Sequence, residues 1–102
     1  MQYFIYRNNG NSQAYPYLLD VQTDLLDDLQ TRVVVPLRDL ASFANVNLPE
    51  PLMPVFDVQG RKCLMETPKI AAVPLRILKK PLISLAQEQT RILAAIDFLF
   101  HG

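Results

Sequence analysis

Few side chains in this sequence have the chemistry of a catalytic group. The 102 residues include one histidine, His101, and one cysteine, Cys63. At the end of the chain little would fix the tautomer of His101 or shield it from water, and Cys63 is expected to be a core or half-buried strand residue. The sequence has no metal-ligand spacing, no glycine-rich phosphate loop and no G-x-S-x-G motif. This inventory predicts a binding protein that is not an enzyme, with no cofactor and no metal.

The charged residues are balanced in number but uneven along the chain. Ten basic and ten acidic residues give a formal net charge of zero, which argues against nucleic-acid binding driven by counterion release. Residues 20–28 carry aspartates and no base, whereas residues 61–80 are rich in lysine and arginine. Two solvated faces explain this pattern. The alternatives are a basic surface that attracts an acidic partner and aspartates that fold inward around a cation.

Length and composition predict one soluble domain, residues 1–102. Half of the residues are hydrophobic, and a domain this small buries only about 60–65% of its unfolded surface, so dimerisation would stabilise it. There is no secretory leader and no apolar run of about 18 residues. A lone cysteine is compatible with a reducing compartment. We therefore expect a cytoplasmic protein that does not contact a membrane.

Hydrophobic alternation and turn residues predict a mainly β chain. The expected strands are 2–7, 15–21, 31–37, 55–58, 62–66 and 70–78. The first two form a hairpin, as do the fourth and fifth, whose turn needs Gly60 for positive φ. Pro36 is expected to end the ladder of its strand because it lacks an N–H.

The segments between the expected strands are predicted to be turns and connections. Residues 22–30 form a connection with Leu25 and Leu26 at its tip. Residues 38–45 contain one or two helical turns with Leu40, Phe43 and Ala44 facing inward, and the proline-rich segment 47–54 is an extended connector.

Residues 84–102 are predicted to form a helix that covers the sheet. Ser84 and Gln87 resemble a capping box, and Pro81 marks the boundary upstream. One stripe of the helix is apolar at helical spacing, namely Leu85, Ile92, Ala95, Ile96 and Leu99. From 92 to 100 only Asp97 is polar. Two interpretations are open: the helix is buried between the sheet and a second subunit, or its last turn presents Leu99, Phe100 and His101 to a different protein.

Three segments carry a resemblance to the CcdB family of toxins. YPYLLDVQTDLLDDLQTRVVVPL (15–37) resembles the family's D-V-Q-S-D core followed by two aliphatic residues and a strand ending in V-I-P-L. PVFDVQGRKCLMETPKIAAVPL (54–75) and AAIDFLFHG (94–102) fit at similar spacing, as does the initial QYFIYR. The resemblance implies a CcdB/MazF-like, SH3-like barrel-type antiparallel sheet of about five strands, a small extra hairpin sheet, a C-terminal helix and a homodimer.

The resemblance also implies the function of a toxin in a type II toxin–antitoxin module. Such toxins bind the A subunit of DNA gyrase and trap the complex with cleaved DNA, and a CcdA-type antitoxin neutralises them. They are not enzymes and do not bind nucleic acid specifically by themselves. The positions that match the family's gyrase-binding surface are Thr23, Leu25, Leu26, Asp97, Phe100, His101 and Gly102. The basic stretch that begins with Arg61, Lys62 and Lys69 is expected to dock the acidic antitoxin.

Two departures from the family pattern predict weaker gyrase inhibition, or none. His101 stands where the family has tryptophan, and the sequence ends at Gly102 without the family's final isoleucine. Imidazole is a smaller platform than indole for stacking on an arginine. Two alternatives from other classes stay open: a MazF-like endoribonuclease, because the same scaffold class includes such enzymes, and an inactive toxin remnant that only binds antitoxin.

Overall fold

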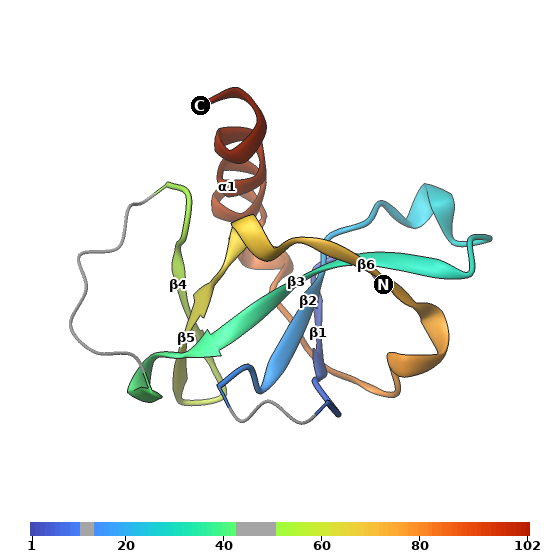
Figure 1. Cartoon of the computed structure of the whole chain (residues 1–102), viewed down its shortest axis with the longest axis horizontal. Helices are drawn as coiled ribbons and strands as arrows, with labels where there is room; N and C mark the ends of the chain where they lie inside the picture. Colours follow the sequence, from blue (N-terminus) through green and yellow to red (C-terminus); the bar gives the residue numbers. More distant parts are fainter. Residues whose placement is uncertain (11–13, 43–50) are drawn as a thin grey trace.

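The computed structural model describes residues 1–10, 14–42 and 51–102. Within these ranges seven strands form one antiparallel, curled sheet, and a single α-helix, α1 (Gln89–His101), stands against it (Figure 1). The predicted fold class, mainly β with a C-terminal helix, is confirmed. The strands are β1 (Phe4–Arg7), β2 (Tyr17–Asp20), β3 (Thr31–Asp39), β4 (Val55–Val58), β5 (Arg61–Met65), β6 (Ala71–Pro74) and β7 (Pro81–Ser84).

The long strand β3 organises the sheet because it pairs with three other strands. The sheet order is β4-β5-β3-β2-β1-β7, and β6 pairs with the first half of β3 on the side opposite β2. The predicted hairpins β1–β2 and β4–β5 are both present. The second hairpin joins the same sheet through β5 and does not form a separate one.

The prediction that Pro36 ends its ladder is wrong, since β3 continues to Asp39. The backbone hydrogen-bonding groups of alternate β3 residues point toward β2, whereas the carbonyl of Pro36 points to the opposite side of the strand. There it lies between the pairing with β6, which ends at Val34, and the pairing with β5, which begins at Leu37. Its carbonyl accepts a hydrogen bond from the Glu66 N–H at 3.1 Å. The missing N–H therefore falls where β3 changes partners, and the strand tolerates it.

The turn between β4 and β5 confirms the predicted need for glycine. Gly60 has a φ of 86°, and Gln59 before it also has a positive φ, 53°. Two consecutive positive φ values are typical of a type I′ hairpin turn. The Gly60 N–H donates to Asp57 Oδ1 at 2.8 Å, which closes the turn.

The chain between β5 and α1 differs most from the sequence-based prediction. The strand expected over 70–78 is shorter, and the 3-10 turn η4 (Leu75–Ile77) follows it. The strand β7 was not predicted, because four residues are too few for their periodicity to distinguish a strand from the start of a helix. Pro81 thus begins a strand. Ser84 Oγ accepts from the Ala86 N–H at 3.1 Å, but the N-caps of the 3-10 turn η5 (Ala86–Glu88) and of α1 are Leu85 and Glu88, so the predicted capping box is wrong.

The prediction for residues 38–45 is confirmed in part, since η2 (Leu40–Ser42) is a short 3-10 helix. Phe43 and Ala44 lie outside the described residues, as do the first residues of the proline-rich connector.

The core lies between the curled sheet and one stripe of α1. Strand residues such as Ile5, Leu19 and Leu37 are fully buried, and Ile92 and Ala95 of α1 complete the cluster. Two further predicted stripe residues contribute: Leu85, which precedes η5, is buried, and Ile96 packs against the cluster. Leu99 is half-buried and lies outside the cluster. The predicted apolar stripe is therefore confirmed except at Leu99.

Cys63 is fully buried in this core, as the sequence indicated. Burial raises the pKa of its thiol from 9.0 to about 11, with a smaller contribution from the charge of Asp39. Because the thiolate is the reactive form, Cys63 has no nucleophilic character near neutral pH.

Candidate functional site

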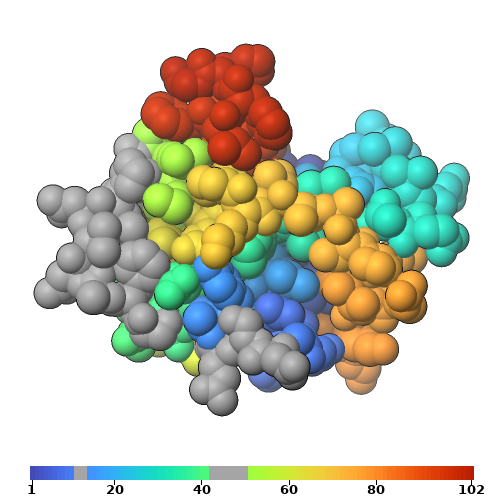
Figure 2. Space-filling view, in the orientation of Figure 1, coloured from blue at the N-terminus to red at the C-terminus, as the bar shows by residue number. Residues whose placement is uncertain are grey.

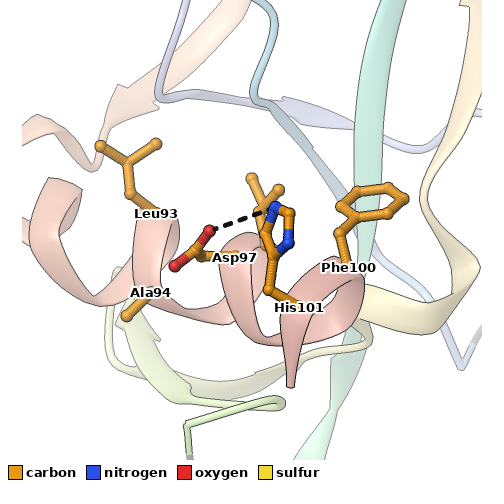
Figure 3. Close-up of a pocket in the computed structure, with 6 residues that line it drawn as sticks. Leu93, Ala94, Asp97, Phe100 and His101 are labelled. Carbon is orange, nitrogen blue, oxygen red and sulfur yellow. Dashed lines mark ion pairs between the residues drawn. The ribbon is translucent and has the colours of Figure 1, made fainter.

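The last two turns of α1 carry an apolar surface that the sheet does not cover. Leu93 and Phe100 are seven residues, or about two turns, apart and lie on the same side of the helix. Their exposed fractions are 43% and 66%. Together with Ala94, Ile96, Asp97 and His101 they line a shallow groove of about 480 Å³ (Figure 3). The structure thus brings Asp97, Phe100 and His101, three of the predicted site residues, onto one surface.

Polar groups border this groove on one side. The Asp97 and His101 side chains point toward one another, with His101 Nε2 3.9 Å from Asp97 Oδ1 (Figure 3). Both are largely exposed, so their pairing leaves them accessible to a partner. Gly102, the fourth predicted residue, closes the helix by donating its N–H to the Phe98 carbonyl at 2.8 Å.

A second exposed apolar patch lies at the tip of the connection between β2 and β3. The short 3-10 helix η1 (Asp24–Leu26) begins after Thr23, whose hydroxyl accepts from the Leu25 N–H at 3.3 Å. Leu25 is 92% exposed and Leu26 is 48% exposed. The predicted loop and its exposed tip are therefore confirmed, although binding by its residues stays a prediction.

An ion cluster beneath this loop fixes its conformation. The Arg32 guanidinium, on β3, donates to both Asp20 carboxylate oxygens at 2.9 and 3.0 Å. It also donates to Asp27 Oδ1 at 2.8 Å, to Asp24 Oδ1 at 3.3 Å and to the Gln22 carbonyl at 2.9 Å. Arg32 and Asp20 are 2% and 0% exposed. The Arg32 side chain thus links the start of the loop, at Asp20 and Gln22, to Asp24 and Asp27 further along it.

The interpretation of residues 20–28 as a solvated acidic face holds for Asp24, Asp27 and Asp28, which are exposed, but is wrong for Asp20, which is fully buried. Asp20, Asp24 and Asp27 gather around a cation that the protein itself supplies. Burial alone would lower the pKa of Arg32, but the hydrogen bonds and the charge of Asp20, with smaller effects from Asp27 and Asp24, raise it above its usual value. Sequence reasoning overlooked Arg32. A lone base within the apolar strand segment TRVVV, following a run of aspartates, was the signal that could have indicated it.

A comparison with protein families shows the family to which this chain belongs. The family model described as CcdB protein matches residues 2–102, which is essentially the whole chain. This chain belongs to the CcdB family. The family is one of toxins that act in toxin–antitoxin pairs, and its members are not catalytic enzymes.

The two exposed patches of this CcdB-family chain are separate. The end of α1 and the loop that carries η1 project from the same, upper side of the molecule, with a dip between them (Figures 1 and 2). Among the described residues no hydrogen bond or ion pair joins the loop to the helix end. The predicted surface is therefore two patches on one side, and a partner that contacts both must span the dip.

The three basic residues expected to dock the antitoxin differ in their surroundings. Arg61 Nη2 lies 2.7 Å from Asp39 Oδ2, and Lys69 Nζ lies 3.6 Å from Glu66 Oε2. The backbone N–H of Ala41 and the Arg61 guanidinium together lower the pKa of Asp39, so this carboxylate keeps its charge. Lys62 is exposed and has no carboxylate partner in the described part of the chain. Two of the three cations are thus already paired in the CcdB-family fold.

Within residues 1–10, 14–42 and 51–102, no group of three or more histidine, cysteine or acidic residues is arranged to hold a metal ion. In the same part of this CcdB-family chain, no helix is long and apolar enough to cross a membrane.

Proposed function

We propose that this CcdB-family toxin binds the A subunit of DNA gyrase and traps the enzyme in complex with cleaved DNA. The observation that carries the proposal is the uncovered apolar end of α1, where Phe100 is 66% exposed in a chain whose core is otherwise well buried. Exposed apolar patches of this kind are typical of protein–protein interaction sites. The nearly fully exposed Leu25, on the same side of the molecule, supports a partner large enough to contact both patches.

The chemistry of the two patches fits a binding role. Fully burying one large apolar side chain contributes about 1.5–3 kcal/mol, so covering the exposed parts of Leu25, Leu93 and Phe100 favours association. Asp97 and His101 add hydrogen-bonding groups at the rim. A toxin that binds one state of gyrase better than the others holds the enzyme in that state, and its catalytic cycle stalls.

We also propose that the chain acts as a homodimer. Phe98 is 41% exposed and precedes Phe100 by two residues, about 200° around the helix, so it lies on a different side from Leu93 and Phe100. A second copy that covers the Phe98 side would leave the groove of Figure 3 open to gyrase. Sedimentation equilibrium at micromolar concentrations is expected to give twice the chain mass, and a monomer at every concentration would contradict this proposal.

A DNA-cleavage assay tests the proposed function. Purified toxin is incubated with gyrase, ATP and supercoiled plasmid, followed by detergent and protease. We expect linear plasmid to accumulate with toxin concentration, and a CcdA-type antitoxin added beforehand to prevent it. Plasmid that stays supercoiled at saturating toxin would contradict gyrase poisoning. Parallel incubation with RNA separates the alternatives, because RNA cleavage would indicate a MazF-like endoribonuclease, and antitoxin binding with neither activity would indicate an inactive remnant.

A further inference from the structure

The chain between β1 and β2 contains an asparagine–glycine step, Asn9–Gly10, that the proposed gyrase contacts do not use. An asparagine followed by glycine is prone to deamidation, because glycine has no side chain to hinder attack of its backbone nitrogen on the asparagine amide carbon. Both residues are exposed, and both line a hollow of about 280 Å³ together with Asn8, Leu18 and Ile77. Water therefore reaches the two groups that react.

Hydrogen bonds hold the side chain of Asn8 but not that of Asn9. Asn8 Nδ2 donates to the Tyr15 carbonyl at 2.9 Å, and Asn8 Oδ1 accepts from the Gly10 N–H at 3.1 Å. Among the described residues the Asn9 side chain has no hydrogen-bond partner, so its amide is free to turn toward the Gly10 nitrogen. The bond from Gly10 to Asn8 must open before the nitrogen attacks, and surface bonds of this kind open at little cost.

Three cations share a groove with Asn9 and have no counter-charge in the described part of the chain. The groove has a volume of about 400 Å³ and is lined by Arg7, Asn9, Lys79, Lys80, Pro81 and Leu82. In the described ranges no carboxylate lies within 4.0 Å of Arg7, Lys79 or Lys80. The segment that carries the lysines, orange in the space-filling view, lies next to the blue N-terminal strand (Figure 2). A carboxylate at position 9 therefore gains attraction from both segments and displaces no existing ion pair.

We infer that Asn9 is a site of spontaneous deamidation and that this basic groove holds the carboxylate that the reaction produces. The Gly10 nitrogen gives up its proton and bonds to Asn9 Cγ, and the side-chain nitrogen leaves with a proton as ammonia, so a cyclic succinimide remains. Water then attacks one ring carbonyl and breaks its bond to the nitrogen. Attack at Cγ gives aspartate, and attack at the backbone carbonyl gives isoaspartate, with no change in oxidation state.

The cations of the groove favour both the reaction and its product. The Gly10 nitrogen attacks as an anion, and an oxyanion forms on the Asn9 amide oxygen during the attack. Positive charges that are already in place stabilise such developing negative charge. Each chain therefore gains one negative charge at position 9 as it ages. The inference does not depend on the proposed gyrase binding, because neither Asn9 nor the groove belongs to the two exposed apolar patches.

Peptide mapping by mass spectrometry tests the reaction. The folded chain is kept in mildly alkaline buffer and digested with trypsin at intervals, and fragmentation distinguishes Asn8 from Asn9 within one peptide. We expect deamidation at Asn9 to be at least about tenfold faster than at Asn8. Gly10→Ala should suppress it, because a Cβ hinders the attack, and this Cβ would lie 3.2 Å from Asn8 Oδ1, the end of a side chain that can shift.

Charge variants test the part played by the groove. Lys79→Gln/Lys80→Gln should slow the reaction by about two- to fivefold, the factor expected for exposed charges of this strength. Lys62→Gln removes an exposed lysine that does not line the groove and should leave the rate unchanged. Thermal melting followed by circular dichroism checks that each variant is folded.

Asn9→Asp supplies the product carboxylate in a homogeneous protein. At about 0.05 M salt it should melt at a higher temperature than the wild type, and the difference should disappear at about 0.5 M salt, since exposed charges are screened. The difference should shrink by at least about half when Lys79→Gln/Lys80→Gln is also present, and should persist with Lys62→Gln. The inference is overturned if Asn9 deamidates no faster than Asn8, if the two groove lysines do not affect the rate, or if Asn9→Asp melts no higher than the wild type at low salt.

Discussion

Replacing Arg32→Met should lower the free energy of unfolding by about 3 kcal/mol or more, because it leaves a buried carboxylate without its principal counter-charge. Asp20 is 0% exposed and receives two hydrogen bonds from Arg32, at 2.9 and 3.0 Å. The remaining cation near Asp20 is the exposed amino group of Met1, 3.2 Å away. Urea unfolding followed by tyrosine fluorescence measures the change.

Two further variants test whether the buried charge is the cause. Asp20→Asn combined with Arg32→Met removes both charges and should recover part of the loss, because no uncompensated ion remains. Arg61→Met removes a comparable hydrogen-bonded ion pair at the surface and should change stability far less, since Arg61 is exposed. A stability of Arg32→Met equal to that of Arg61→Met would contradict the role given to the ion cluster.

Phe100→Asp and Leu25→Asp should each weaken binding to the gyrase A subunit by about 100-fold or more. Each substitution puts a charge at the centre of an apolar contact, and hot-spot residues of this kind contribute about 2–4 kcal/mol. Because Phe100 and Leu25 are 66% and 92% exposed, the free toxin should remain folded. Surface plasmon resonance with immobilised gyrase A fragment measures the affinities.

Two further variants serve as comparisons: one should leave gyrase affinity unchanged, and the other should increase it. Ile77→Asp introduces the same charge at an apolar residue that is 38% exposed but lines a separate hollow with Asn8 and Leu18, so gyrase affinity should be unchanged. His101→Trp should strengthen binding by up to about tenfold, since an indole stacks on a guanidinium better than an imidazole does. Equal losses for Ile77→Asp and Phe100→Asp would show that charge alone, and not the location, decides binding.

Local sequence patterns were sufficient for the parts of the fold that local physics determines. Alternating apolar residues identified the β1–β2 hairpin, and the need for positive φ at Gly60 identified the turn between β4 and β5. The helical spacing of Ile92, Ala95 and Ile96 identified the buried side of α1. In each case the residues that carry the signal are close together in sequence.

The errors share a dependence on contacts between distant residues. Pro36 does not interrupt the ladder of β3 because it lies where the pairing with β6 ends and the pairing with β5 begins, and both of these strands come much later in the sequence. β7 is a strand because β1 supplies its hydrogen bonds. Asp20 is buried because Arg32 reaches it from the next strand. None of these partners can be read from the residues around the position itself.

The candidate site was partly predictable for the same reason. Composition placed Leu25 and Leu26 at the tip of a connection, and the excess of apolar residues near Phe100 indicated surface that a single sheet cannot cover. The pairing of Arg61 with Asp39 and of Lys69 with Glu66 depends on the folded arrangement and could not be read from the basic stretch alone.

Calorimetric titration of the dimerisation region of gyrase A with the purified toxin tests the central claim most directly. The account predicts a saturable exothermic or endothermic binding isotherm with a dissociation constant of about 10 μM or tighter, which corresponds to about −7 kcal/mol. The same titration with Phe100→Asp should give no saturable binding. An absence of saturable heat for the folded wild-type chain at several temperatures, or isotherms that do not differ between the two proteins, would contradict the assignment of the end of α1 as a gyrase-binding surface.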